Sequence, residues 1–365
     1  MNNVLSIFAT KNEDKQDKEV NTVKEKLLQE ILNNNQISLQ TKIRAIWLTL
    51  ENKNIKFNDY NSNIAISDSN LFNGGFHEFI KFYGFKNDSK KKNAFITSKN
   101  RSGCYSINFT DVDNNRYINK MSLSKWVEGS PYYPKTFIAT KKEDFRKLPL
   151  VQTQKYFVKS IFGVGSKSIG ISIGNNLIYR PDILEKVPVV VQEGVKNMRL
   201  NEGRKEDERV YVLWVKINGK IRVFLHTKTM VRMCKKKYSE SITKDTHFTI
   251  LVNNPHGIIK SCKNPCELEL LKPIVIDITK RVMPHISKKM LNNHVVEFWL
   301  TGWDILFDIN NHPWLLEINS RPNQCESVKA RLMHYPIYQQ IYEMIHSHYN
   351  NREFELKDFV EIFYF

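Results

Sequence analysis

The stretch that decides the fold lies near the end of the chain: Thr301-Gly-Trp-Asp-Ile-Leu-Phe-Asp-Ile-Asn-Asn-His-Pro-Trp-Leu-Leu-Glu-Ile-Asn-Ser-Arg-Pro322. Two apolar runs of strand length, residues 303–308 and 313–319, flank the tetrapeptide Ile-Asn-Asn-His. This pattern predicts an antiparallel hairpin with a short polar loop. A loop of those four residues would place Asp308 opposite Pro313, Leu306 opposite Leu315, and Asp304 opposite Glu317.

The predicted register puts the carboxylates of Asp304 and Glu317 on one face of the hairpin. Asn319 follows Glu317 by two residues, so its amide lies on the same face. Opposed like charges about 5 Å apart repel, and a cation would relieve the repulsion. Two acids and an amide are oxygen donors that suit Mg²⁺. The alternative for these three residues alone is a solvated hairpin end with scattered acids.

The composition describes a large, strongly basic chain. It has 365 residues, a formal net charge of +17 and five scattered cysteines, which we interpret as free thiols. It shows neither an apolar run long enough to cross a membrane nor a signal-peptide core, so we expect a cytoplasmic protein with no membrane contact. The charge favours a polyanionic partner. The lysine cluster at residues 90–92 lacks interleaved aromatic residues, so we do not expect nucleic-acid binding.

A glycine-rich segment, Gly163-Val-Gly-Ser-Lys-Ser-Ile-Gly170, separates two predicted strands at residues 155–160 and 169–173. Its backbone N–H groups could approach phosphates, with Lys159 and Lys167 as point charges. A P-loop would need glycine where Ser166 precedes Lys167, and a dinucleotide-binding fingerprint would need its third glycine at Ser168. The segment is therefore predicted to be a glycine-rich flap between antiparallel strands.

Two further strand segments carry polar residues. The run Val187-Pro-Val-Val-Val-Gln-Glu-Gly194 predicts a buried strand, either an ordinary core strand or one whose polar end meets an adenine edge. Residues 207–216 and 221–226 predict a second hairpin around the turn Asn218-Gly219, with Asp207 and Arg209 at its mouth. Helical spacing of apolar residues predicts helices within residues 21–50, 268–291 and 338–349.

In this order, the segments resemble the tubulin tyrosine ligase-like family of ATP-grasp enzymes over residues 117–325. The family's magnesium motif is similar to two segments of this chain, Trp303-Asp-Ile-Leu-Phe-Asp308 and Pro313-Trp-Leu-Leu-Glu-Ile-Asn319. A strand of the family with the sequence Asp-Leu-Arg-Ile-Tyr-Val-Leu is similar to Asp207-Glu-Arg-Val-Tyr-Val-Leu213. The resemblance implies an α+β, ATP-grasp fold with an additional N-terminal α/β lobe. We expect a disordered tail (1–20), an N-terminal lobe (21–115), a central lobe (116–195), a C-terminal lobe (196–350) and an extension (351–365).

The resemblance also implies the roles of individual residues. Phosphates of ATP would meet Lys159, Lys167 and the flap glycine Gly170; the adenine edge would meet Gln192 and its neighbour Glu193; and Asp207 and Arg209 would line the mouth of the cofactor site. Magnesium ions would bind Asp304, Glu317 and Asn319. Arg232 matches an arginine near the transferred phosphate, so it joins Lys167 and Glu317 as an expected catalytic group.

The implied activity is an ATP- and Mg²⁺-dependent ligase that adds an amino acid (tyrosine, glutamate or glycine) to an acidic protein acceptor such as the tubulin C-terminal tail. The expected partners are that acceptor and a free amino acid, with the enzyme as a monomer. Two departures stand out, Glu193 where many relatives have lysine and Ile250 where the family usually has asparagine. The alternatives are a ligase for another peptide or metabolite, and a non-catalytic basic binding protein on the same fold.

Overall fold

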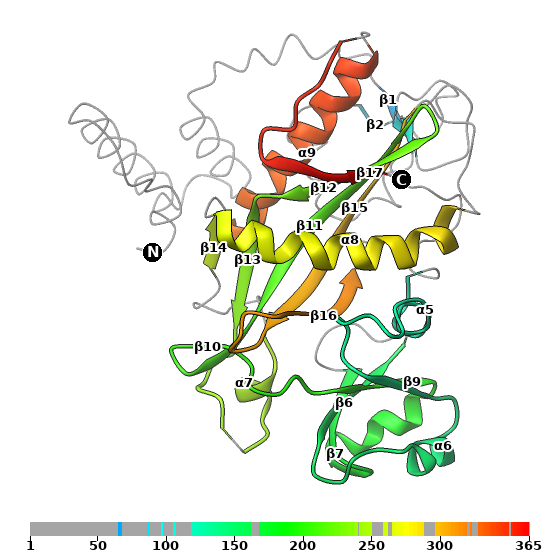
Figure 1. Cartoon of the computed structure of the whole chain (residues 1–365), viewed down its shortest axis with the longest axis vertical. Coiled ribbons are helices and arrows are strands. Elements are labelled where there is room, and N and C mark those ends of the chain that lie inside the picture. The colour runs from blue at the N-terminus through cyan, green and yellow to red at the C-terminus, as the bar shows by residue number, and fades with distance from the viewer. Residues whose placement is uncertain are drawn as a thin grey trace, which may run out of the picture. The chain divides into compact units, whose positions relative to one another are not determined.

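The computed structural model describes most of the chain from Ile118 onward (Figure 1). The described residues are 65–67, 86–87, 96–97, 105–106, 118–161, 168–239, 241–249, 258–261, 265–287, 296–319, 322, 328–349 and 352–364. The chain divides into two units, Met1–Ser106 with Asn323–Lys357, and Ile107–Pro322 with Asp358–Phe365. The predicted tail at residues 1–20, the helices within residues 21–50, Lys167 and Ile250 lie outside the described residues, and the predicted lobe boundaries stay predictions.

The first unit contributes short strands and one long helix to the described part. Strands β1 (Ala65–Ser67), β2 (Lys86–Asn87), β3 (Ile96–Thr97) and β4 (Tyr105–Ser106) pair in parallel, β1 with β2 and β3, and β3 with β4. Helix α9 (Val328–Tyr349) includes the predicted helix at residues 338–349. It begins ten residues earlier than the apolar spacing indicated.

A five-stranded antiparallel sheet forms the smaller layer of the second unit. Its order is β5 (Thr136–Ala139), β9 (Val189–Glu193), β6 (Lys155–Ser160), β7 (Ile169–Ile173) and β8 (Asn176–Tyr179). Alternation along β6 sends Tyr156 and Val158 into a core with Phe145 of α6 (Lys142–Lys147) and Ile183 of the 3₁₀ helix η5 (Pro181–Lys186). Phe157 and Lys159 therefore point to the opposite face.

The larger sheet of this unit is built around β11 (Arg204–Ile217). One edge of β11 pairs with β15 (Val296–Phe307), and the other pairs first with β13 (Lys228–Met233) and then with β12 (Lys220–His226). The outer strands are β16 (Pro313–Asn319) on β15, β14 (Ile258–Ser261) on β13, β17 (Phe359–Tyr364) on β12, and β10 (Leu200–Asn201) at the start of β11. Asn218 and Gly219 take positive φ of 52° and 80° at the predicted turn.

Helix α8 (Pro265–Ser287) covers one face of the larger sheet, as Figure 1 shows. Its buried side chains pack with Trp214, Trp299 and Trp303 in one hydrophobic core of the described residues. Since even-numbered residues of β11 from Val210 to Trp214 enter this core, odd-numbered residues point to the other face. That face carries Asp207 and Arg209.

The hairpin register differs in part from the prediction. Asp304 lies opposite Glu317 as predicted, but Phe307 rather than Asp308 faces Pro313, and Ile305 rather than Leu306 faces Leu315. The reason is a β-bulge between Asp304 and Ile305, which leaves Leu316 as an extra residue on β16. The loop is also longer than four residues because Asp308 leaves the ladder and its carboxylate accepts from the backbone N of Asn310 and His312.

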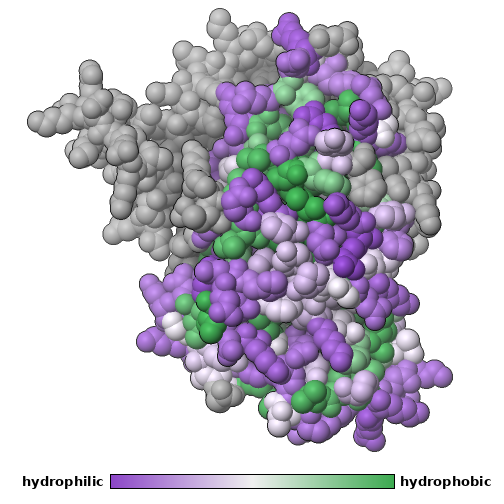
Figure 2. Space-filling model, viewed as in Figure 1, coloured by the Kyte–Doolittle hydropathy of each residue, from purple (hydrophilic) through white to green (hydrophobic). Residues whose placement is uncertain are grey.

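The described surface is mostly hydrophilic in the view of Figure 2, with hydrophobic residues emerging in separate places. No helix within the described ranges has the length and apolar character needed to cross a bilayer. The hydrophilic surface agrees with a chain whose formal net charge is +17.

Candidate active site

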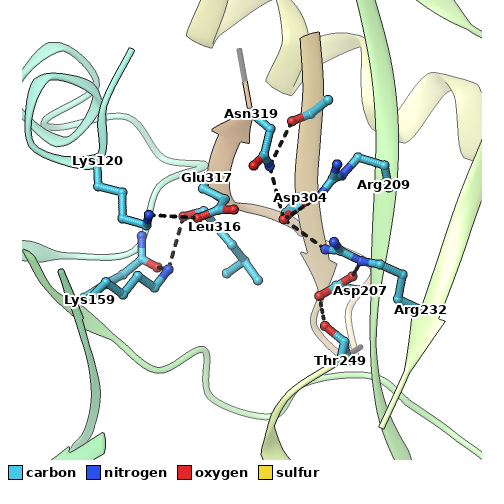
Figure 3. Close-up of polar contacts among 12 residues, drawn as sticks. Lys120, Lys159, Asp207, Arg209, Arg232, Thr249, Asp304, Leu316, Glu317 and Asn319 are labelled. Carbon is cyan, nitrogen blue, oxygen red and sulfur yellow. Dashed lines mark hydrogen bonds and ion pairs between the residues drawn. The ribbon is translucent and has the colours of Figure 1, made fainter. Parts of the chain in front are cut away.

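A row of charged side chains crosses four strands on the face of the larger sheet opposite α8 (Figure 3). Arg232 of β13 lies opposite Asp207 of β11, and Arg209 of β11 lies opposite Asp304 of β15. Glu317 of β16 continues the row beyond Asp304. Alternation along each strand places these side chains on one face, so the predicted residues of three separate sequence motifs meet there.

Asp304 is the most strongly paired carboxylate of the row. Its two oxygens accept from Nε and Nη2 of Arg209, and Nη2 of Arg232 lies 3.0 Å from its Oδ2. Burial raises the pKa of Asp304, but the two guanidinium groups outweigh burial and hold the pKa at about 2. The carboxylate is therefore ionised throughout the physiological range.

Asp207 receives both a cation and a hydroxyl. Arg232 donates from Nε to Oδ1 at 2.5 Å, and the hydroxyl of Thr249 donates to Oδ2. Burial raises the pKa of Asp207, and Arg232 works against that rise. Thr249 follows the short helix α7 (Lys244–His247), so the hydrogen bond ties this segment to the row.

Lys159 reaches the row from the smaller sheet. Its Nζ donates to Oε1 of Gln192 at 2.6 Å and to the backbone oxygen of Leu316 at 3.3 Å. Leu316 is the extra residue of the bulge, so the bulge presents a carbonyl that a regular ladder would have used. Burial lowers the pKa of Lys159 to about 8, although nearby Glu317 favours the charged form. A desolvated cation therefore stands beside the carboxylate at the end of the row.

Glu317 is the least constrained acid of the row. Lys120 of α5 (Lys120–Trp126) lies 3.8 Å from its Oε2, and its side chain is 27% exposed. Asn319 donates its Nδ2 to Oδ2 of Asp304 at 3.4 Å and to the oxygen of Gly302 at 3.3 Å. The amide oxygen of Asn319 is thereby turned away from these acceptors, toward the side on which Glu317 lies (Figure 3).

These donors fit a hard divalent cation. Glu317 and Asn319 offer oxygens outside the arginine network, and Asp304 supplies a second carboxylate one strand away. Within the described ranges no group of three or more His, Cys, Asp or Glu side chains could hold a metal by itself. A Mg²⁺ ion held here would complete its shell with water and substrate phosphates, as it usually does.

The two predicted adenine contacts lie on opposite faces of β9. Gln192 pairs with Phe157, and its Nε2 is buried without a hydrogen-bond partner in the described part of the chain. Such a donor suits a ligand acceptor atom. Glu193 pairs instead with Tyr156, whose side chain lies in the core of the smaller sheet. The structure therefore does not bring the Glu193 side chain to the Lys159 side, and its contact with the cofactor stays a prediction.

Gly170 lies within β7 and is closely packed. A Cβ there would approach Cγ2 of Ile183 to 2.8 Å and the backbone oxygens of Tyr179 and Arg180 to 3.1 Å. This packing explains why the position carries glycine, because a side chain would collide with the backbone after β8. The predicted phosphate contacts of Gly170 and of Lys167 stay predictions.

Sequence reasoning missed three residues of the site. Lys205 lies two positions before Asp207 on the same face of β11, is buried, and holds its Nζ 4.5 Å from the centre of the Phe157 ring. Burial lowers the pKa of Lys205. Lys120 and Gly302 complete the set. Alternation along β11 could have indicated Lys205. Lys120 belongs to the segment Asn119-Lys120, which also resembles the family, but no role in the site was predicted for it.

Two antiparallel sheets, with a lysine of the smaller sheet meeting a carboxylate row on the larger one, define an ATP-grasp fold. Comparison with family models matches residues 102–269 and 265–351 to the tubulin-tyrosine ligase family. The matched residues make up more than half of the chain, and the chain belongs to this family.

Individual relatives are similar at low identity. A probable tubulin polyglutamylase of Caenorhabditis elegans, ttll-9, is 28% identical over 216 residues, which are 50% of this chain and 48% of the relative. Tubulin glycylase 3F of Tetrahymena thermophila is 31% identical over 141 residues, 33% of this chain and 15% of the relative. A probable alpha-tubulin polyglutamylase of the same organism, Ttll1, is 28% identical over 161 residues, 38% of each chain. The chain thus spans half or less of these relatives.

Proposed function

We propose that the chain is an ATP- and Mg²⁺-dependent ligase that joins an amino acid to a protein acceptor. The observation that carries this proposal is the convergence of Lys159, from the smaller sheet, on the bulge next to Glu317. A cation beside a carboxylate that faces a second carboxylate suits a nucleotide triphosphate bound with Mg²⁺. Family membership supports the same reaction class.

In the proposed reaction, a substrate carboxylate takes the γ-phosphoryl group of ATP to give an acyl phosphate. The amine of the second substrate then displaces inorganic phosphate and loses a proton, which leaves an amide bond. This chemistry requires no covalent nucleophile from the protein. It requires positioning and neutralisation of charge, which supply most of the catalysis in phosphoryl transfer.

The residues of the row would divide this work between phosphates, metal and substrate. Lys159, Lys167 and Lys205 would neutralise phosphate oxygens, and Gln192 would meet the adenine edge through its buried Nε2. Asp304, Glu317 and Asn319 would hold Mg²⁺, which polarises the phosphoryl oxygens when bound. Arg232 and Arg209 bind Asp207 and Asp304 in the structure, and their remaining N–H groups would hold the substrate carboxylate.

The proposed acceptor is an acidic tail of the tubulin type. The formal net charge of +17 favours an acidic partner electrostatically. The similar proteins bear names of tubulin polyglutamylases and a tubulin glycylase. Those names leave glutamate and glycine as the first amino acids to try, and a tubulin acceptor implies a cytoplasmic location.

The test is Mg²⁺-dependent ATP consumption by the purified chain with tubulin and a mixture of amino acids. The key variant is Glu317→Gln, because it removes one metal-binding charge and keeps the shape. The matched control is Glu361→Gln, which makes the same change in the exposed ion pair of β17 with Arg222. We expect turnover that needs acceptor and amino acid, persists in the control, and falls at least about 100-fold in Glu317→Gln.

The same experiment separates the alternatives. Omission of amino acids one at a time identifies the donor, and replacement of tubulin by other acidic peptides identifies the acceptor. Equal turnover in wild type and Glu317→Gln would refute the proposed metal site. Absence of Mg²⁺-ATP binding by the wild-type chain would refute the ligase and leave a basic binding protein.

A further inference from the structure

A second charged cluster lies on the opposite face of β11 from the active-site row. It consists of Glu206 and Glu208, which alternate with Asp207 and Arg209 along the strand, and of Arg199 from the segment before β10. Nη2 of Arg199 lies 3.1 Å from Glu206 and 3.2 Å from Glu208. The glutamate side chains are 9% and 3% exposed, so one guanidinium forms ion pairs with two buried carboxylates.

Each glutamate has a further hydrogen bond that fixes its position. Asn201 donates to Oε2 of Glu206 at 3.0 Å, and the hydroxyl of Thr229 on β13 donates to Oε2 of Glu208 at 2.9 Å. A buried carboxylate with this many partners cannot move without breaking them. The cluster therefore holds the backbone of β11 where the strand carries Asp207 and Arg209.

Arg199 also binds the hairpin that carries the metal-binding acids. Its backbone N donates to the oxygen of Phe307 at 2.8 Å, and its guanidinium lies 4.6 Å from the centre of the Phe307 ring. Nη1 donates to Oδ1 of Asn311 in the loop between β15 and β16 at 3.2 Å. Arg199 thus connects β11 to the end of β15 and to the loop that leads into β16.

We propose that Arg199 is a positioning residue for the active site. By fixing the active-site end of β11 against the turn of β15 and β16, it sets the spacing between Asp207 and Arg209 on one strand and Asp304 and Glu317 on the others. The effect of Arg199 on catalysis rests on the proposed function. Its other effect, the ordering of the hairpin, follows from the contacts alone.

The burial of Glu208 supports this inference, because the residue is only 2% exposed. A buried glutamate is unfavourable at an apolar position unless a cation and hydrogen bonds compensate it. Arg199 and Thr229 supply that compensation here.

The experiment separates stability from positioning with two variants. Arg199→Met removes the cation and leaves both carboxylates buried. The triple variant Arg199→Met/Glu206→Gln/Glu208→Gln removes all three charges and keeps acceptors for Asn201 and Thr229. The stability control is Val282→Ala, which shortens a fully buried side chain of α8 in the core on the other face of the sheet from the row.

The measured quantities are thermal stability, amide hydrogen exchange and ATP turnover. We expect Arg199→Met to lose stability and the triple variant to regain most of it. In the triple variant, the exchange rate of the amides in residues 305–319 should still rise at least about tenfold relative to that of the α8 amides. Turnover should fall about 10- to 100-fold, because small displacements of catalytic groups lower the rate by that much. Val282→Ala should raise exchange in α8 and keep turnover per folded molecule.

The ratio of exchange between the hairpin and α8 decides the question, whatever the overall stability of the triple variant. A wild-type ratio in the triple variant would overturn the proposal, since Arg199 would then only balance charge. A wild-type chain without ATP turnover would instead refute the proposed function, and the exchange ratio would still test the positioning role.

Discussion

The substitution Gly302→Ala tests how the arginine network is fitted into the sheet. Gly302 lies on β15 two residues before Asp304, so it shares the face of the row. An added Cβ would come within 2.7 Å of Cβ of Pro322 and 2.9 Å of Cδ of Arg209. Ordinary carbon contacts are about 3.5 to 4 Å, so both neighbours must move, each by up to about an ångström. Pro322 is the stiffer of the two, and we expect the larger displacement at Arg209.

The displacement of Arg209 should be costly because its guanidinium binds both oxygens of Asp304. We expect Gly302→Ala to lower the free energy of unfolding by about 2 to 3 kcal/mol, from overpacking and a weakened charged hydrogen bond. Arg209→Met should cost about 3 kcal/mol, the lower end for a broken buried pair, since Arg232 still neutralises Asp304. Both changes should also weaken Mg²⁺-ATP binding.

A double-mutant cycle measured by urea unfolding checks this reasoning. Once Arg209 has been replaced by methionine, the alanine has a more flexible neighbour to displace. The double variant should therefore lose at least about 1 kcal/mol less than the sum of the single changes. Additivity within about 0.5 kcal/mol would mean that Gly302 is required by Pro322 or by the backbone, and not by the arginine that crosses it.

Three further changes have expected outcomes with different physical causes. Lys159→Met should raise the melting temperature, because a desolvated charge disappears, while Mg²⁺-ATP binding measured by calorimetry is lost. Burial holds the pKa of His226 at about 4, below its ordinary value of 6.5, so stability is present above pH 6.5 and is lost as the pH falls toward 4. Urea unfolding at pH 7.5 and 5 should differ by about 2 kcal/mol more in wild type than in His226→Gln. Gly219→Ala should lower the free energy of unfolding by about 1 kcal/mol, because the φ of 80° is strained for alanine. Steric clash is not the cause, since the added Cβ would meet nothing within 4 Å.

The strands and their faces could be predicted because period-two patterns are local. Residues 155–160 and 169–173 form the predicted strands, and Asp304 lies opposite Glu317 as alternation required. The bulge at Leu316 could not be predicted, since a single extra residue leaves the apolar pattern of the hairpin almost unchanged. The strand that carries Arg232 was also missed as an element, and its pairing with β11 explains how this arginine reaches Asp207.

Contacts between distant segments account for the rest of what the sequence concealed. Lys120 reaches Glu317 from a helix almost 200 positions earlier in the chain, and Arg199 meets Asn311 across a loop. The periodic patterns of the sequence do not indicate either contact, because each depends on how helices, strands and loops pack together. Lys205 was within reach of a local argument, since it alternates with Asp207 and Arg209 on the same face of β11.

The charge balance of the site indicates which ligand the row favours first. Three carboxylates, Asp207, Asp304 and Glu317, stand among the cationic side chains of Lys120, Lys159, Arg209 and Arg232 (Figure 3). Lys205 adds a fifth cation on the same face of β11. Two of the acids are already neutralised by arginines at hydrogen-bond distance, so a bare divalent cation would meet an excess of like charge. A polyphosphate reverses that excess and brings its own oxygens to the metal. Magnesium should therefore bind weakly alone and tightly together with the nucleotide, which calorimetric titration of each can establish.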